Sequence, residues 1–228
     1  MILSICRPYF APYPGYFYRI YRSDRVVLLD DVQFPRGTTW ITRNRFKNDQ
    51  GVLWLTVPVR KKHRGLQQIK DVRINTDGRW PRKHPAALKT AYARAPYLKE
   101  HLSFIEAVFD GSYTRILDMD RAIIQYTLQA LGITRDIVLQ SELGIRGAGD
   151  RLLVEICRKT GATTYLAQSD VRKYIDADLF ARANIRLEFC QPPPVVYPQL
   201  WGEFVSNLST LDLILNCGPK ALEILVGN

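Results

Sequence analysis

The sequence has little of what a disulfide-stabilised or metal-binding protein requires. It contains four cysteines and three histidines in 228 residues, and the closest two cysteines, Cys190 and Cys217, are 27 positions apart. That spacing excludes a CxxC redox or zinc pair. The sequence also has no HExxH, EF-hand or Walker motif, so we predict no metal and no cofactor. Each cysteine has apolar neighbours and is expected to be a buried, reduced thiol. Cys6, next to Arg7, is the best candidate for a reactive thiol.

Long hydrophobic runs and a secretory signal are also lacking. No apolar stretch approaches the roughly 18–20 residues that a membrane helix needs. The start, MILSICRPYF, has no basic segment ahead of its apolar residues. We therefore expect a cytoplasmic protein without membrane insertion. The composition, 46% hydrophobic and 24% charged, is typical of a folded globular chain.

Positive charge is present in excess, and it is concentrated near the start. Residues 1–100 hold 20 Lys and Arg against 7 Asp and Glu, a formal charge of +13, whereas residues 101–228 carry −3. Such asymmetry predicts an anionic partner for the first part of the chain, either a phosphate-bearing small molecule or an acidic carrier protein. The alternative is a basic surface that only aids solubility.

The order of apolar runs and helical periodicities predicts an α/β fold. Strands at 1–6 and 26–30 flank a helix near 16–21, which makes a βαβ unit with parallel strands. Further strands are predicted at Val52–Val59, Ile69–Asn75, Ile137–Leu139, Thr163–Leu166 and Ile185–Phe189. Helices are predicted at Trp80–Tyr92, Tyr97–Phe109, Arg115–Leu131, Asp150–Thr160 with Asp150 as its N-cap, Asp176–Ala183, Leu208–Leu215 and Ala221–Val226. We predict one domain over residues 1–228, a Rossmann-like three-layer sandwich with a mostly parallel sheet and a helical insertion at about 78–132.

The first loop contains two candidate substrate-binding residues, Tyr9 and Gly15. A loop between a strand and a helix can present backbone N–H groups to a phosphate, and glycine allows close approach. The alternative is a proline-constrained loop that packs its aromatic side chains into the core.

Asp30, Asp31 and Gln33 follow the second predicted strand. Ligands of open α/β sheets bind at the carboxyl ends of the strands. Asp30 and Asp31 are therefore candidate catalytic residues, with Asp30 as a base or a ligand for a sugar hydroxyl, and Gln33 is a candidate substrate-binding residue. A helix N-cap is the alternative for Asp31.

A cluster of cations lies just beyond, at Arg43, Arg45 and Lys47. Arginine offers bidentate hydrogen bonds to a phosphate and lysine a point charge. Arg43 and Lys47 are four positions apart, so on a helix they would share a face. Asn44 is expected to orient the ligand. The alternative is a solvated helix face.

His84 is the third candidate catalytic residue, with Lys83 beside it as a substrate-binding residue. Both precede Pro85 at the predicted start of a helix, where the neutral imidazole is favoured and suits a general base. A purely structural histidine is the alternative. Ser169 and Tyr174 are substrate-binding candidates at the end of a late strand, although a turn also explains Ser169.

The combined motifs resemble the WbqC-like family of bacterial proteins. The matching segments are Arg7–Phe10, Gly15–Phe17, Leu29–Phe34, Arg43–Arg45, Leu55–Val59, Lys83-His84, Tyr92–Tyr97, Tyr165-Leu166, Tyr174–Asp176 and Leu208–Leu213. Arg7 stands where the family usually has Gln. The resemblance implies a role in making surface polysaccharides or secondary metabolites. A weaker similarity is to nucleotidylyltransferases and pantothenate synthetases, but their His-x-Gly-His motif is replaced here by Tyr13-Pro14-Gly15-Tyr16.

Three functions remain open at this point. The first is a transferase that moves an acyl or aminoacyl group from a carrier-protein or coenzyme thioester to an amine or hydroxyl, such as that of an amino sugar. The second is a nucleotidyltransferase-like enzyme on a Rossmann-like core. The third is a nucleic-acid-binding module, because aromatic residues alternate with cations between Trp40 and Trp54. The paired aspartates nearby argue against nucleic acid as the partner.

Overall fold

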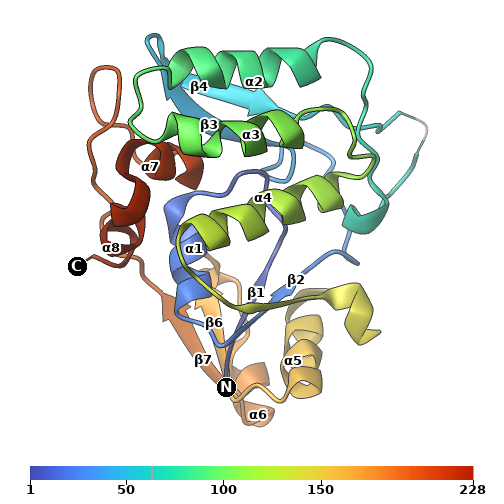
Figure 1. Cartoon of the computed structure of the whole chain (residues 1–228). Coiled ribbons are helices and arrows are strands. Elements are labelled where there is room, and N and C mark those ends of the chain that lie inside the picture. The colour runs from blue at the N-terminus through green and yellow to red at the C-terminus, as the bar shows by residue number, and fades with distance from the viewer. Residues whose placement is uncertain (63, 228) are drawn as a thin grey trace.

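The centre of the structure is a five-stranded parallel sheet with the strand order β5–β2–β1–β6–β7 (Figure 1). The computed structural model describes residues 1–62 and 64–227. His63, one of the three histidines counted above, lies outside the described residues. The strands are β1 (Ile2–Cys6), β2 (Arg25–Leu28), β5 (Asp136–Leu139), β6 (Thr164–Gln168) and β7 (Arg186–Cys190). The predicted parallel βαβ start is confirmed.

Helices cover both faces of the sheet because alternate strand residues point to opposite sides. On one face, Val26 and Leu28 pack with α1 (Pro14–Tyr21), α4 (Ile116–Ala130) and α8 (Ala221–Val226). On the other face, Val27 packs with α5 (Gly149–Thr160) and α6 (Ala177–Arg182). The arrangement is the predicted three-layer, Rossmann-like α/β fold.

The chain between β2 and β5 builds a second cluster of apolar residues at one end of the molecule. It contains an antiparallel hairpin of β3 (Arg43–Asn48) and β4 (Gly51–Thr56), followed by α2 (Trp80–Ala91) and α3 (Leu98–Val108). Helix α7 (Thr210–Cys217) completes it. Figure 1 shows α4 between this cluster and the sheet, and α4 contributes side chains to both.

The strand predicted at Val52–Val59 is present as β4, which lies in this hairpin outside the main sheet. The helical spacing considered for Arg43 and Lys47 does not apply, because residues 43–48 form a strand that pairs with β4. The predictions for Ile69–Asn75 and for the N-cap role of Asp150 are wrong. Ile69–Asn75 is no strand, because Ile69–Asp71 forms a 3-10 turn. Asp150 is not the N-cap of α5, because that position is Ala148 and Asp150 lies in the first turn.

Other helix ends follow the expected chemistry. Helix α5 ends at Gly161 with φ of 71°, a left-handed conformation that suits glycine. Asp176 caps α6 by accepting a hydrogen bond from the Leu179 N–H at 3.2 Å. In the described part of the chain, no helix is both long enough and apolar enough to cross a membrane.

Candidate functional site

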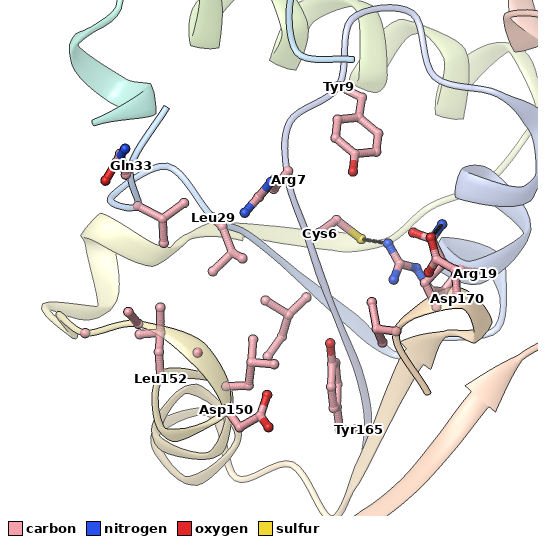
Figure 2. A pocket seen from close by; sticks show the side chains of 18 residues that line it. Cys6, Arg7, Tyr9, Arg19, Leu29, Gln33, Asp150, Leu152, Tyr165 and Asp170 are labelled. Carbon is pink, nitrogen blue, oxygen red and sulfur yellow. Dashed lines mark hydrogen bonds between the residues drawn. The ribbon is translucent and has the colours of Figure 1, made fainter. Parts of the chain in front are cut away.

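A pocket of about 500 Å³ opens at the carboxyl ends of β1 and β6 (Figure 2). The chain runs from β1 outward to β2 and β5, then returns to β6 on the other side of β1. Ligands of doubly wound sheets bind at such a reversal of strand order. We call this hollow the switch-point pocket, and its polar lining comes from Cys6, Arg7, Tyr9, Arg19, Gln33, Asp150, Tyr165, Gln168 and Asp170.

Arg19 is the most deeply buried cation of the switch-point pocket. It lies on α1 with only 6% of its surface exposed, and its Nη2 atom donates to the Cys6 Sγ atom at 2.9 Å. No carboxylate of the described residues lies within 4.0 Å of its guanidinium. A buried arginine stays charged and ordinarily has an acidic partner. Arg19 is therefore placed to receive an anion from the pocket.

The Cys6 thiol is a weak partner for this cation. Burial raises the pKa of Cys6, and the nearby charge and hydrogen bond of Arg19 only partly oppose that effect. The thiol is thus neutral near pH 7, so the Arg19–Cys6 contact does not neutralise the guanidinium.

Helix α5 points its positive end toward the switch-point pocket. Gly147, Ala148 and Gly149 line the pocket, and no side chain of the described residues caps the helix. Its first N–H groups and the helix dipole favour an anion. Gly147 and Gly149 have φ angles of 150° and 59°, which a residue with a side chain would adopt only with strain.

Two carboxylates also line the switch-point pocket. Asp150 Oδ2 accepts the Asp176 N–H at 2.7 Å, and Asp170 Oδ2 accepts from Gln168 Nε2 at 3.0 Å. The pocket thus holds cations from the loop after β1 and from α1, and anions from α5 and the segment after β6. Figure 2 shows Arg7 and Tyr9 apart from Asp150 and Tyr165.

A second hollow of about 350 Å³ adjoins the first and shares Val32, Gln33, Gly147 and Ala148 with it. Asp31 forms part of its wall and pairs with Lys70 Nζ at 2.6 Å and Arg146 Nε at 3.9 Å. Asp31 is therefore neutralised by protein cations at the edge of the site. No group of three or more His, Cys, Asp or Glu within residues 1–62 and 64–227 is arranged to hold a metal.

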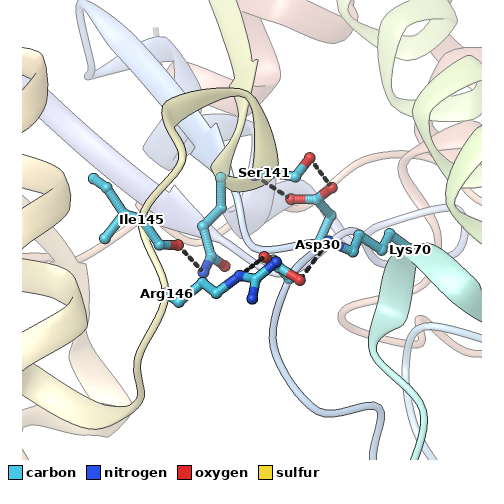
Figure 3. A network of polar contacts seen from close by, with 7 residues as sticks. Asp30, Lys70, Ser141, Ile145 and Arg146 are labelled. Carbon is cyan, nitrogen blue, oxygen red and sulfur yellow. Dashed lines mark hydrogen bonds and ion pairs between the residues drawn. The ribbon is translucent and has the colours of Figure 1, made fainter.

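Asp30 precedes Asp31 in the chain but lines neither of the two cavities. Its carboxylate accepts the Ser141 N–H at 2.9 Å and the Ser141 hydroxyl at 2.5 Å, and only 1% of the residue is exposed (Figure 3). These bonds join the end of β2 to the end of β5. Of the predicted site residues, only Tyr9 and Gln33 line the switch-point pocket. Ser169 follows the lining residue Gln168, and Tyr174 is 84% exposed.

Gly15 allows the side chains of Tyr13 and Pro192 to pack closely against the backbone. A Cβ atom there would lie 2.8 Å from Tyr13 Cε2 and 3.3 Å from Pro192 Cγ. The start of α1 is therefore covered by protein atoms, and Gly15 is not part of the pocket wall.

His84 packs against Trp80 and Phe109 in the apolar cluster built by the β3–β4 hairpin, α2, α3 and α7, which we call the hairpin cluster. Helix α2 begins at Trp80, so His84 is in its second turn and Pro85 lies inside the helix, contrary to the predicted start. His84 Nε2 is 2.8 Å from the Thr56 carbonyl oxygen, and burial lowers its pKa despite that hydrogen bond. The neutral form is favoured as expected, but by desolvation and not by a helix terminus. Lys83 is exposed on the same helix.

The predicted cluster of cations, Arg43, Arg45 and Lys47, lies along β3, and we call it the cationic clamp. Arg43 lies over the Trp54 ring at 3.7 Å, and Arg45 donates to the Ser206 and Asn207 carbonyl oxygens. Trp54 in turn stacks on Trp40. Each cation of the clamp has its own protein partner, since Lys47 Nζ donates to Gln199 Oε1 and the Glu203 carbonyl oxygen.

Asn44 has a structural contact to the first loop. Its Nδ2 atom donates to the carbonyl oxygens of Phe10 and Ala11, at 3.1 and 2.7 Å. These bonds tie the hairpin to the segment that leaves β1 and so fix the path of the chain beside Arg7 and Tyr9.

The sequence prediction missed Arg19, Asp150 and Asp170 as residues of this site. A signal for Arg19 was present, because it shares the apolar face of α1 with Tyr16 and Ile20. A single charge on the buried face of a helix is unusual and marks a group with a special partner. No comparable signal marks Asp170, because the path of the chain after β6 decides which way it points.

Comparison with known proteins places the chain in a family. The sequence profile of the WbqC-like protein family matches residues 7–224. The chain belongs to the WbqC-like family. Its similarity extends to the uncharacterized protein Rv1507c of Mycobacterium tuberculosis, which is 30% identical over 226 residues and is aligned over 98% of this chain and 96% of its own length. No solved structure matches this WbqC-like protein significantly.

Proposed function

We propose that this WbqC-like protein is a transferase that binds an anionic small molecule in the switch-point pocket. The observation that carries the proposal is Arg19, a buried cation that opens onto a cavity and has no acidic partner in the described chain. Arg7 and the uncapped start of α5 add positive potential to the same pocket. A volume of about 500 Å³ suits a small metabolite or the end of a cofactor arm.

The reaction we propose is transfer of an acyl or aminoacyl group from a carrier-protein or coenzyme thioester. An acceptor amine or hydroxyl attacks the thioester carbonyl carbon, a C–N or C–O bond forms, and the C–S bond breaks. The acceptor's proton ends on the departing thiolate. Asp150 and Asp170 are the carboxylates within the pocket that can relay this proton. The charge of +13 in the first hundred residues suits an acidic carrier or a phosphate-bearing arm.

Nucleotidyl transfer is the second candidate, and the strand order favours it. Counted within the sheet, the order is 3-2-1-4-5, which matches the first five positions of the 3-2-1-4-5-6 order of dinucleotide-binding folds. Two observations weigh against it. The start of α1 is covered by Tyr13 and Pro192 and does not line the pocket, and His84 lies in the distant hairpin cluster.

Binding to Arg19 is tested first. Calorimetric titration with inorganic phosphate and with coenzyme A is carried out on the wild type, Arg19→Lys, Arg19→Met and the control Arg22→Met. Arg22 lies at the end of the same helix and is exposed, so its loss matches the charge change without touching the pocket. We expect Arg19→Met to weaken binding about tenfold or more, because a charge-assisted hydrogen bond is lost, and Arg22→Met to leave it unchanged.

Turnover is tested with aminoacyl thioesters and an amino-sugar nucleotide, followed by mass spectrometry. Thioester consumption no faster than in a protein-free blank would contradict group transfer. Release of pyrophosphate from ATP or CTP would instead favour the nucleotidyl alternative. Equal binding by wild type and by folded Arg19→Met would contradict the anion site.

A further inference from the structure

The switch-point pocket contains opposite charges that do not neutralise each other. Arg7 and Arg19 line it together with Asp150 and Asp170. Within the described residues, no nitrogen of these arginines lies within 4.0 Å of a carboxylate oxygen. The four charged side chains thus line one cavity, and none of them forms an ion pair with another described residue.

Each of the two carboxylates keeps one oxygen for a further donor. The hydrogen bonds from the Asp176 N–H and from Gln168 Nε2 both go to Oδ2 atoms. The Oδ1 atoms of Asp150 and Asp170 accept no hydrogen bond from residues 1–62 and 64–227. An ionised carboxylate has room for several donors, so both groups remain able to bind a cation.

Two tyrosines of the pocket lie within the influence of both signs of charge. Burial raises the pKa of Tyr165, while Arg19 lowers it and Asp150 raises it. Burial also raises the pKa of Tyr9, while Arg7 and Arg19 lower it and Asp170 raises it. The pKa values of both tyrosines thus respond to cations and to anions that line the same pocket.

We propose that the switch-point pocket selects a zwitterion, a small molecule with an anionic group for Arg19 and a protonated amine for Asp150 and Asp170. This inference rests on the proposed anion site and names the substrate class for it. A purely anionic ligand gains the contact with Arg19 but leaves two carboxylates facing it, so it should bind more weakly than a ligand that also carries an amine. The added amine is attracted to these carboxylates. Amino acids and phosphorylated amino sugars both have this chemistry.

Matched probes separate the amine from the anion. L-alanine is compared with propionate, and glucosamine 6-phosphate with glucose 6-phosphate, by calorimetric titration. Within each pair the amine is the principal change, whereas the two pairs differ in whether the anion is a carboxylate or a phosphate. We expect the amine-bearing member of at least one pair to bind about tenfold more tightly or better.

Substitutions then assign the amine to its partners. Asp150→Asn and Asp170→Asn each keep an oxygen for the existing hydrogen bond but lose the charge. Each is expected to reduce the preference for the amine-bearing probe and to leave or improve binding of its amine-free partner. Asp178→Asn is the control, because Asp178 is exposed on the nearby helix α6 and does not line the pocket. Thermal melting verifies that every variant is folded.

The outcomes distinguish this inference from the proposed function. If both members of each pair bind equally and Arg19→Met abolishes binding, the proposal of a zwitterionic ligand is overturned, whereas the proposed anion site is supported. If neither member of either pair binds, or if binding is unchanged in folded Arg19→Met, both proposals are overturned. If the amine-bearing probe still binds more tightly than its amine-free partner in Asp150→Asn, in Asp170→Asn and in the double variant, the proposal of a zwitterionic ligand is also overturned.

Discussion

The Nη2 atom of Arg19 lies 2.9 Å from the Sγ atom of Cys6, where β1 ends and the switch-point pocket begins. The two residues are 13 positions apart, joined by a loop and the first turns of α1. Because the thiol is neutral, Arg19 keeps its charge available to the cavity. The contact fixes the orientation of the guanidinium but supplies no negative charge to pair with it.

Cys6 is expected to be a slow nucleophile. Since burial raises its pKa and Arg19 lowers it, alkylation by iodoacetamide at pH 7 should be about tenfold or more slower than that of glutathione, and it should accelerate as the pH rises. Arg19→Met should slow it further. Cys157 is the internal control, because burial raises its pKa to about 12 and its reactivity should not respond to Arg19. Alkylation of Cys6 as fast as a free thiol would identify it as an activated nucleophile.

We expect Asp30 to stabilise the fold through its hydrogen bonds with Ser141. Ser141→Ala removes the hydroxyl that donates to Asp30 Oδ2, so the free energy of unfolding should fall by about 1–3 kcal/mol in urea denaturation. Binding of inorganic phosphate should stay unchanged. Ser169→Ala is the control, because Ser169 is exposed and should not alter stability. A normally stable Asp30→Ala protein that has lost turnover would instead support the catalytic role predicted from its place at the strand edge.

The central strands of the sheet could be predicted from the sequence because each contains a short apolar run. Parallel strands buried on both faces are made of such runs, and β1, β2 and β6 have this pattern. The hairpin strand β3 was missed because its sequence, RNRFKN, is mostly polar. Its Lys47 is only 2% exposed because the Gln199–Glu203 region covers it, more than 150 residues later in the chain.

The sequence also indicated the sheet edge at which the candidate pocket lies, but not which side chains line that pocket. Asp30 and Asp170 both follow strands of the sheet, yet one faces Ser141 and the other lines the pocket. The partner of Asp30 is 111 positions away. Long-range pairing of this kind leaves no local signal, whereas the charge of Arg19 on an apolar helix face does.

His84 is expected to stabilise the hairpin cluster. Its ring packs against Trp80 and Phe109, and its Nε2 atom bonds the Thr56 carbonyl group. His84→Ala should therefore lower the melting temperature, while binding of phosphate at Arg19 should change less than about threefold. The pKa of His84 is lowered by burial, so the unfolded chain binds more protons near pH 6, and the contribution of His84 to stability should diminish as the pH falls through the unfolded pKa of about 6.5. A His84→Ala protein that melts at the wild-type temperature but has lost turnover would instead support a catalytic role for His84.

Asp120 on α4 should make the protein less stable as the pH rises. It is fully buried, neither carboxyl oxygen has a hydrogen-bond partner in the described chain, and desolvation raises its pKa well above the ordinary value. The folded protein therefore keeps a proton that the unfolded chain releases. Between the unfolded and folded pKa values, this one group lowers the free energy of unfolding by about 1.4 kcal/mol per pH unit.

Asp120→Asn should remove that slope, because the amide has nearly the same shape and does not titrate. Urea denaturation from pH 5 to pH 8 should give a difference between wild type and variant that grows with pH in favour of the variant. Asp118→Asn is the control, since Asp118 lies on the same helix in an exposed ion pair with Arg115 and should shift stability only slightly. Parallel pH profiles for wild type and Asp120→Asn would show that Asp120 is ionised in the folded protein, and a cation close to its carboxylate would then be required.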